Sequence, residues 1–445
     1  MRLSEALRIS PRVSCAFVGA GGKSALMGRV AAELAGDMPI VLSTTTRIAL
    51  HQRQLATNHL ILQDKLELAT LRPFLEGPGT ILLTGRVAPG EPKWLGLDPA
   101  ILEGVRKMVS QAGGVLLIEA DGAKGRSLKA PADHEPAIPP FTDLVVVVAG
   151  MDAVGQPIRS DSVHRPERVA ALLGADESEI LTPAAIGLLL ASAEGGLQSV
   201  PRAAEVRVTL NKVEDDSSEA DARQVAAQVL KESRVRAAVL ASALGAQAVR
   251  SVIGRVPGVV LAAGGSRRIG RSKQLIPWKG KPLVWHAVQT ARRAGLDPLV
   301  VVVGPDSAGV RQALSDQPVV FVENPSWAQG QSTSVQAGLR SVERVAEAVV
   351  FLLCDTPLVT PELIQGLIGE HQQTLTPIVA PRIEGRWANP VLFDRVTFEA
   401  FAALRGDIGG RELFERFRMA GISADPRIGL DIDTSADLRK LESGG

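Results

Sequence analysis

A glycine turn in the second half of the chain is followed by a dense group of basic residues. The apolar stretch 259–263 ends on Gly264 and Gly265, and three arginines and a lysine then occur within seven residues. Glycines let backbone N–H groups approach an anion closely, and the side chains of Arg268 and Lys273 can reach its negative charge. The chain carries 49 basic and 48 acidic residues, so this positive charge is local. The pattern favours phosphate binding over the alternative, a solvated basic turn.

Three aspartates are candidates for holding a divalent cation. Asp355 ends the apolar stretch 348–355, while Asp431 and Asp433 alternate along an extended segment, so that their side chains point to one face. Mg²⁺ prefers one or two carboxylates together with phosphate oxygens and water. Asp355 could instead cap the next helix. The spacing does not decide which of Asp431 and Asp433 binds the metal.

The residues from 261 to 273 follow the order Leu-Ala-Ala-Gly-x-Ser-x-Arg-Ile-Gly-x-x-Lys. This order resembles the signature of MobA-like NTP transferases, and most closely that of the molybdenum cofactor cytidylyltransferases. The resemblance covers 257–438 and continues at 323–339, 351–360 and 429–438. It implies a Mg²⁺-dependent enzyme that transfers CMP from CTP to molybdopterin and releases pyrophosphate. Two alternatives are a transferase acting on a sugar or polyol phosphate, and a non-catalytic chaperone that binds the molybdenum cofactor.

The same resemblance implies roles for individual residues. Arg268, Lys273 and Asp355 are the expected catalytic residues, and Asp355 with Asp431 or Asp433 the expected metal ligands. The expected nucleotide-binding residues are Leu261, Ala262, Ala263, Gly264, Gly265, Ser266, Arg268, Lys273, Asn324 and Ser332. Ser332 or Thr333 could also simply cap a helix.

The resemblance is incomplete in two places. Gln331 stands where methionine is usual in this family. Trp387 and Ala388 depart from the family's Arg-Gly-Asn/His-Pro-Val segment. The departure at Trp387 and Ala388 concerns the acceptor side more than the nucleotide side.

A second glycine turn lies near the N-terminus, in the segment Gly-Ala-Gly-Gly-Lys-Ser. Gly21, Gly22, Lys23 and Ser24 are the candidate nucleotide-binding residues here. A strict phosphate-loop pattern would require glycine at position 17, where the chain has Phe17. A lysine in the first turn of a helix opposes the helix dipole unless an anion lies nearby. The alternative is a structural strand, turn and helix without a ligand.

Later segments of the first half agree with this interpretation. Glu119 and Asp121 end an apolar stretch, as does the acid that follows the strand in many nucleotide-binding proteins. Asn211 and Lys212 begin an Asn-Lys-x-Asp-like element in which Glu214 replaces aspartate. We therefore expect Asp121, Asn211 and Lys212 to contact a nucleotide, with ATP and GTP both open.

A polar loop follows the Asp121 segment. The cluster of Lys124, Arg126, Lys129, Asp133 and His134 is interpreted as an anion-facing loop or, equally, as a solvated one. Residues 10–245 resemble the YqeC accessory family, which is linked to selenium-dependent molybdenum hydroxylases. The residues that carry this resemblance lie at 19–24, 119–136 and 163–167. It implies an apo molybdenum hydroxylase as a partner.

Strands that alternate with amphipathic segments must position these residues. In the first half we expect strands at 14–19, 40–44, 80–85, 115–120, 144–150 and 206–212, and in the second half at 259–264, 298–304, 318–323, 348–355, 376–381 and 390–394. This alternation is typical of parallel sheets covered by helices. The predicted fold class is α/β, with two three-layer α/β/α domains. A phosphate-loop-like domain spans 1–253, and a Rossmann-like nucleotidyltransferase domain spans 254–445.

Composition limits the remaining possibilities. A net charge of +1 gives no global field for nucleic acid or an anionic membrane. Cys15 and Cys354 are the only cysteines, which argues against a disulfide framework and a cysteine zinc site. No apolar run reaches the roughly 18 residues that a membrane span needs. We expect a cytoplasmic protein.

Overall fold

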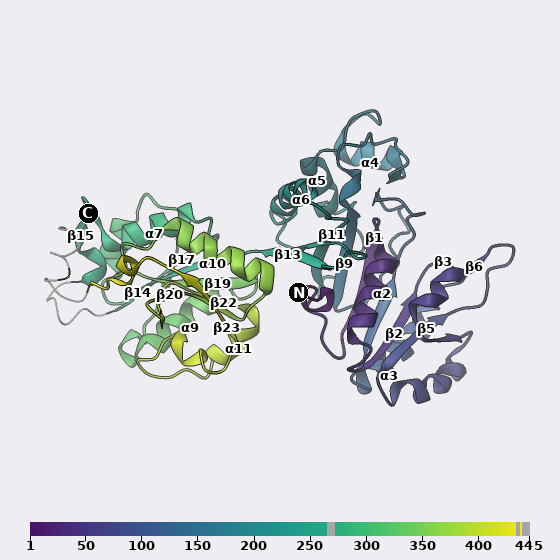
Figure 1. Cartoon of the computed structure of the whole chain (residues 1–445), viewed down its shortest axis with the longest axis horizontal. Helices are drawn as coiled ribbons and strands as arrows, with labels where there is room; N and C mark the ends of the chain where they lie inside the picture. The colour runs from purple at the N-terminus through teal and green to yellow at the C-terminus, as the bar shows by residue number, and fades with distance from the viewer. Residues whose placement is uncertain (265–271, 433–436, 438–445) are drawn as a thin grey trace. The chain divides into compact units, whose positions relative to one another are not determined.

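The computed structural model describes residues 1–264, 272–432 and 437. The chain divides into two compact units, Met1–Ile253 and Gly254–Gly445. Each is described by itself. In both units a central sheet is covered by helices on its two faces, which confirms the predicted α/β class (Figure 1).

The first unit is built on a sheet of nine strands in its described residues. Their order across the sheet is β13 (Val249–Gly254), β12 (Val235–Ala241), β11 (Glu205–Asn211), β9 (Leu144–Gly150), β1 (Ser14–Gly19), β7 (Val115–Glu119), β2 (Pro39–Thr44), β5 (Gly79–Thr84) and β4 (Asn58–Ile61). The pairings from β4 to β12 are parallel. Strand β1 is therefore central, and the glycine turn leaves its carboxyl end.

Helices pack on both faces of this sheet. They are α1 (Leu3–Ala6), α2 (Lys23–Leu34), α3 (Pro99–Gln111), α4 (Pro166–Leu173), α5 (Pro183–Ala191) and α6 (Asp216–Val229). One core joins α4, α5 and α6 to alternate residues of the strands, such as Ala16 and Val18 of β1. Because side chains alternate across a strand, Cys15 and Phe17 point to the opposite face. Helix α2 packs against β1, β2 and β7 and starts directly after the glycine turn.

The second unit has a mixed sheet. In its described residues the order is β18 (Val320–Glu323), β17 (Leu299–Val303), β14 (Gly258–Ala262), β19 (Ala348–Leu353), β22 (Val391–Asp394), β20 (Ile378–Ile383) and β21 (Arg386–Trp387), with β23 (Met419–Ser423) also paired to β20. Strands β18, β17, β14 and β19 are parallel, whereas β22 is antiparallel to both β19 and β20. The expected parallel pairing is found at β18, β17, β14 and β19, and the antiparallel strand β22 is a feature that was not expected.

Two cores cover the faces of this mixed sheet. Helices α7 (Leu283–Arg293), α8 (Ser307–Ala313) and α10 (Pro361–Thr374) pack on one face, and α9 (Gln331–Val342) and α11 (Phe398–Phe401) on the other (Figure 1). Valine residues of β14 alternate between the cores, with Val260 in one and Val259 in the other. The strand is buried on both faces, which explains its continuous apolar sequence.

Several strands were not anticipated, and β13 is the most informative. The segment 240–258 lies between the strands expected in the two halves, and Pro257 and Gly258 interrupt it, so its sequence is that of a connection. The structure instead places Val249–Gly254 at the edge of the first sheet. The strand is short and closely followed by the Pro-Gly break, so the sequence alone does not distinguish it from a connection.

Among the described residues, no helix is long and apolar enough to cross a membrane.

Candidate active site

The glycine turn of the second unit leaves the centre of its sheet. Strand β14 lies between β17 and β19, and Ala263 and Gly264 follow its last residue. Ligands of open α/β sheets bind at the carboxyl ends of such central strands. Gly265, Ser266 and Arg268 lie outside the described residues, so their predicted phosphate contacts stay predictions.

Lys273 and Asp355 meet at this edge of the sheet. Lys273 begins the short 3₁₀ helix η4 (Lys273–Leu275), and Asp355 lies two residues beyond the end of β19. The Lys273 Nζ atom is 2.6 Å from Asp355 Oδ2, and both side chains are mostly buried. Two predicted site residues that are 82 positions apart thus form one ion pair.

The first of the expected acidic pair, Asp431, also reaches this place. The backbone N–H of Ile432 donates to the carbonyl oxygen of Asp355 at 2.9 Å, which fixes the neighbouring Asp431 beside the end of β19. Asp433 lies outside the described residues. The alternative that Asp355 caps a helix is wrong, because α10 begins at Pro361 and Thr360 caps it.

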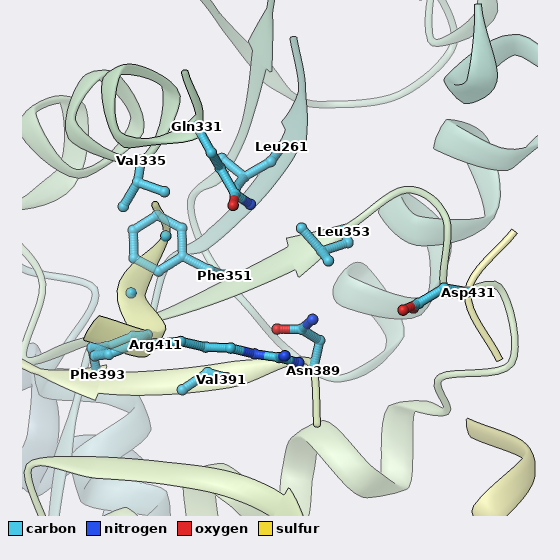
Figure 2. A pocket seen from close by; sticks show the side chains of 12 residues that line it. Leu261, Gln331, Val335, Phe351, Leu353, Asn389, Val391, Phe393, Arg411 and Asp431 are labelled. Atoms are coloured by element: carbon cyan, nitrogen blue, oxygen red, sulfur yellow. The ribbon is translucent and has the colours of Figure 1, made fainter. Parts of the chain in front are cut away.

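A cavity of about 270 Å³ opens beside these residues (Figure 2). Its lining combines apolar and polar side chains. Leu261, Val335, Phe351, Leu353, Val391 and Phe393 provide the apolar part, and Gln331, Asn389, Arg411 and Asp431 the polar part. An adjoining pocket of about 530 Å³ shares Leu261, Gln331 and Leu353, and adds Gly264, Trp327 and Asp407. The glycine turn therefore borders a space large enough for a substrate of nucleotide size.

Asn324 and Ser332 are buried and bonded to the protein itself. The Asn324 amide nitrogen donates to the hydroxyls of Thr333 and Ser334, each at 2.9 Å, and its oxygen accepts from Ser326 N–H. The Ser332 hydroxyl donates to the carbonyl of Gly406 at 2.9 Å. Neither Ser332 nor Thr333 caps α9, whose N-cap is Gly330. Direct nucleotide contacts of Asn324 and Ser332 stay predictions; in the structure Asn324 holds Ser334, which lines the adjoining pocket, and Ser332 holds Gly406, which precedes the pocket residue Asp407.

The acidic residues of the second unit offer oxygen ligands for Mg²⁺. Asp355 Oδ1 is buried and accepts no hydrogen bond from the described residues, so one carboxylate oxygen is available in addition to the one that Lys273 holds. In the described part of the chain, no group of three or more His, Cys, Asp or Glu could hold a metal ion. A site with one or two carboxylates fits Mg²⁺, which takes its other ligands from phosphate and water.

The glycine turn of the first unit is closed around Lys23. Gly21 and Gly22 have φ angles of +83° and +107°, and a Cβ on Gly21 would lie 2.1 Å from the backbone nitrogen of Gly150. Lys23 Nζ donates to Gly19 O at 2.6 Å and lies 3.1 Å from Asp121 Oδ1. A lysine in the first turn of a helix needs a negative charge nearby, and in this structure Asp121 provides that charge.

Ser24 faces a different acid. Its hydroxyl donates to Glu119 Oε2 at 2.8 Å, and Gln52 Nε2 lies 2.6 Å from the same hydroxyl. Asp121 is held from several sides, since its Oδ2 atom accepts from Gly19 N–H and lies 2.9 Å from Lys129 Nζ. Of the two acids at the end of β7, Glu119, the last residue of the strand, contacts Ser24 of the first turn of α2, and Asp121 is the counter-ion of Lys23 and Lys129.

Asn211 and Lys212 contact the same region. Asn211 Nδ2 donates to Gly21 O at 2.7 Å, and its Oδ1 accepts from Ala243 N–H. Lys212 Nζ donates to Asp152 Oδ2 at 2.6 Å and to the Ser127 hydroxyl at 2.9 Å. The structure brings all the predicted residues of this half to one end of the sheet, and nucleotide binding by them stays a prediction.

The polar loop after Asp121 divides into exposed and buried residues. Lys124, Asp133 and His134 are exposed, whereas Lys129 is buried and lies 2.9 Å from Glu135 Oε2, which also accepts from Arg165. Burial alone would raise the pKa of Glu135, but hydrogen bonds from Arg165 and Lys129 lower that pKa to about 2. Burial and the neighbouring cations Arg165 and Lys129 also lower the pKa of His164. This loop therefore holds a buried ionic network.

Comparison with known proteins identifies both units. Residues 258–421 match the MobA-like NTP transferase domain, and residues 15–167 match the YqeC protein family. The second unit therefore carries a MobA-like NTP transferase domain and the first unit a YqeC domain. Both predicted resemblances are confirmed.

Each of three individual relatives matches part of the chain. The nicotine blue oxidoreductase of Paenarthrobacter nicotinovorans is 28% identical over 198 residues, which cover 42% of this chain and 96% of that protein. The uncharacterized protein YqeC of Escherichia coli K12 is 35% identical over 88 residues, or 20% of this chain and 34% of that protein. The bifunctional protein GlmU of Symbiobacterium thermophilum is 36% identical over 118 residues, and this chain spans only 25% of its length.

A solved structure is similar to part of the chain. The crystal structure of Rv0371c from Mycobacterium tuberculosis H37Rv is 30% identical, and the match covers 42% of this chain and 98% of that chain with a TM-score of 0.38.

Four residues of the second site were not anticipated from the sequence. Gln331 had been noted only as a departure from the family pattern, and Asn389, Asp407 and Arg411 carried no assigned role, although all four line the pockets. Gln331 is the first residue of α9, Arg411 belongs to a short 3₁₀ helix at Gly410–Leu413, and Asn389 and Asp407 lie outside helices and strands, so no periodic pattern marks the four together. Only the Gly-Asp and Gly-Gly-Arg pattern at 406–411 could have marked this loop as unusual.

Proposed function

We propose that the chain transfers CMP from CTP to molybdopterin and releases pyrophosphate. The MobA-like NTP transferase domain supports transfer of a nucleotide, and the Leu-Ala-Ala-Gly opening of the glycine turn supports a pyrimidine nucleotide. The cavity lined by Asp431 and Leu353 supports a second substrate next to the triphosphate. The product supplies the cofactor of a molybdenum hydroxylase, whose apo form is the proposed partner.

The reaction requires alignment more than covalent participation. A terminal phosphate oxygen of the acceptor forms a bond to the α-phosphorus of CTP, and the bond from that phosphorus to the β-bridging oxygen breaks. Lys273 and Arg268 stabilise the negative charge on the phosphates, and the backbone at Gly264 leaves room for them. A phosphate monoester is already anionic near neutral pH, so the chain needs no general base.

Mg²⁺ held by Asp355 and by Asp431 or Asp433 would neutralise phosphate charge during the transfer. Lys273 then exchanges its ion pair with Asp355 for contacts with the triphosphate. The ion pair keeps both charges compensated while the site is empty, which lowers the cost of holding them in a partly buried place.

One observation carries this proposal more than any other. The 2.6 Å contact between Lys273 and Asp355 joins the end of the glycine-turn segment to the carboxylate after β19, at the carboxyl edge of the two central strands. A cation and a carboxylate at this edge are what a metal-bound triphosphate needs.

The test measures pyrophosphate release by the full chain with molybdopterin and, separately, CTP, GTP, UTP and ATP. We expect release with CTP and formation of the cytidine dinucleotide of molybdopterin. Preference for GTP would contradict the choice of nucleotide. Release only with a sugar or polyol phosphate would contradict the acceptor, and inactivity with every nucleotide alongside tight cofactor binding would indicate a chaperone.

We further propose that the first unit binds ATP or GTP as an accessory domain. The glycine turn, Lys23 and Asn211 lie together at one end of its sheet, which supports this proposal. Binding titrations of both nucleotides to residues 1–253 test it. Failure of both to bind would make the turn structural.

A further inference from the structure

Gln274 is a buried polar residue at the glycine turn that the proposed mechanism does not use. Only 4% of its surface is exposed. Its side-chain nitrogen donates to the carbonyl oxygen of Ala262 at 3.0 Å and to that of Gly264 at 3.3 Å. Both acceptors belong to the end of β14 and to the turn that follows it.

The chemistry of these contacts fixes the orientation of the amide. Both neighbours are carbonyl oxygens, which accept only, so the NH₂ end of the side chain must face them. Ala262 is buried and Gly264 is exposed, so the amide ties the buried end of β14 to the exposed start of the turn. A hydrophobic side chain of the same size would fill the space but would not hold the turn.

The position of Gln274 in the chain links this anchor to Lys273. The two residues are adjacent in η4, and successive side chains of a 3₁₀ helix point in directions about 120° apart. Lys273 reaches Asp355 after β19, whereas Gln274 reaches the end of β14. One short helix is thus tied to both central strands.

We propose that Gln274 is a positioning residue that holds Lys273 and the glycine turn in register for phosphate binding. This inference rests on the proposed nucleotidyl transfer for its kinetic consequence. Its geometric consequence, the placement of Lys273, does not depend on the reaction. Loss of the amide lets η4 shift relative to β14, and misplacement of a catalytic group by about 1 Å can cost roughly a hundredfold in rate.

The test compares Gln274→Met and Gln274→Glu with Gln289→Met as a matched control. Gln289 is also a buried glutamine with an amide bonded to protein, in α7, where its nitrogen donates to Gln317. Methionine keeps the length of the side chain without its donors. Glutamate keeps the shape of the side chain. When it is ionised, its carboxylate oxygen faces the carbonyl oxygens of Ala262 and Gly264, and none of these three atoms can donate a hydrogen bond.

The first measurement does not need activity. The full chain is treated with an amine-reactive reagent. Mass spectrometry of the peptide that contains Lys273 then gives the rate at which this lysine is modified. Lys273 is held against Asp355 with 18% of its side chain exposed, so we expect the Gln274 variants to react at least about threefold faster than wild type, as weakly held groups do. The Gln289→Met variant should react at the wild-type rate.

The second measurement is kinetic. We expect kcat/KM for CTP to fall by about tenfold to a hundredfold in both Gln274 variants, and to change less than about twofold in Gln289→Met at equal loss of thermal stability. Unchanged Lys273 reactivity and unchanged kcat/KM in a folded Gln274→Met protein would overturn the inference. If Gln274→Met does not fold, Gln274→Asn, which keeps the amide on a shorter side chain, takes its place with the same expected directions.

The two proposals fail in different ways. Absence of transfer by the wild-type chain with every nucleotide contradicts the proposed function, and the reactivity of Lys273 still decides the role of Gln274. Normal transfer by wild type and by both Gln274 variants contradicts only the positioning role.

Discussion

At the scale of a single residue, the two carboxylate oxygens of Asp355 have different surroundings. One of its oxygens is bonded to Lys273, and the other is buried without a hydrogen bond from the described residues. A buried carboxylate oxygen without a donor is costly unless a ligand completes its surroundings. We therefore regard Asp355 as held ready for a cation.

Replacing Asp355 tests this role. We expect Asp355→Ala and Asp355→Asn to lower kcat for CMP transfer at least about a thousandfold, because charge stabilisation of the transition state is lost. The thermal midpoint should change little, since Lys273 can turn to solvent. Steady-state kinetics and a thermal melt of each variant measure the two quantities.

The matching control is Asp407→Asn, which removes a carboxylate that lines the adjoining pocket but is not a predicted metal ligand. Mg²⁺-dependent turnover by Asp355→Ala would rule out its metal role.

Glu135 illustrates how a buried ionic network responds to pH. Its pKa is about 2 in the folded chain, below the ordinary value of 4.5, because Arg165 and Lys129 hold its ionised form. Between these values the unfolded chain binds more protons than the folded one, so the free energy of unfolding rises with pH. The contribution of Glu135 is complete above about pH 4.5 and is lost as the pH falls towards about 2.

The Glu135→Gln variant should therefore lose stability at neutral pH and show a shallower fall between pH 4.5 and 2. Urea unfolding of the full chain at several pH values measures this slope. A variant whose pH dependence parallels that of wild type would show that Glu135 is not responsible.

At the scale of elements, the start of α9 depends on a close backbone approach. Gly330 has a φ angle of +113°, and a Cβ there would lie 2.2 Å from the backbone of Gly406. This contact brings the 406–411 loop, which carries Asp407 and Arg411, against the first turn of α9. Two segments that are far apart in the sequence, the start of α9 and the 406–411 loop, therefore form this part of the pocket wall.

Gly330→Ala tests this packing. We expect a loss of at least about 2 kcal/mol in the free energy of unfolding, since the left-handed conformation costs about 1–2 kcal/mol and the clash adds to it. The matched change is Gly385→Ala, where φ is +82° and nothing lies within 4 Å of the added Cβ. Equal losses in the two variants, measured by urea unfolding, would show that the approach to Gly406 is not tight.

At the scale of the whole molecule, the chain consists of two units. Each has its own sheet and its own glycine turn, and the predicted sites lie within the units. The roles of Lys23 and of Lys273 should therefore be separable.

We expect Lys23→Ala to weaken ATP or GTP binding by residues 1–253 roughly tenfold to a hundredfold, as loss of a charge-assisted hydrogen bond of about 1.5–3 kcal/mol implies. CMP transfer by the full chain should stay within about twofold of wild type. Calorimetric titration and pyrophosphate release measure these two quantities. Lys124→Ala, in an exposed position, is the control. A Lys23→Ala protein that loses stability and binds nucleotide normally would make the N-terminal turn structural.

The end of the first unit provides a further prediction. Val249 and Val252 of β13 are fully buried at the edge of its sheet. A fragment that ends at residue 246 should be about 3 kcal/mol less stable than one that ends at 254, because each buried valine contributes about 1.5 kcal/mol or more. Equal urea midpoints for the two fragments would show that β13 is dispensable.

The amino-acid sequence by itself determined the local features of this protein. Strands β1 and β9 occur at the predicted residues, since fully buried strands of parallel sheets are continuous apolar runs. The order of residues from Leu261 to Lys273 indicated the transferase domain, because a glycine turn, its basic residues and its spacing all lie within one short segment.

Tertiary structure decided which distant residues meet. The order of the strands in each sheet determines these contacts. It places Asp355 next to Lys273 and the Gln274 amide next to the end of β14. In the first unit it places Glu119 next to Ser24 and Asp121 next to Lys23. Sequence periodicity shows which face of a strand is buried, but it carries no information on which strand lies beside it. For the same reason the sequence predicted β22 as a strand but not its antiparallel pairing, and it indicated neither β13 at the edge of the first sheet nor the pocket residues of the 406–411 loop.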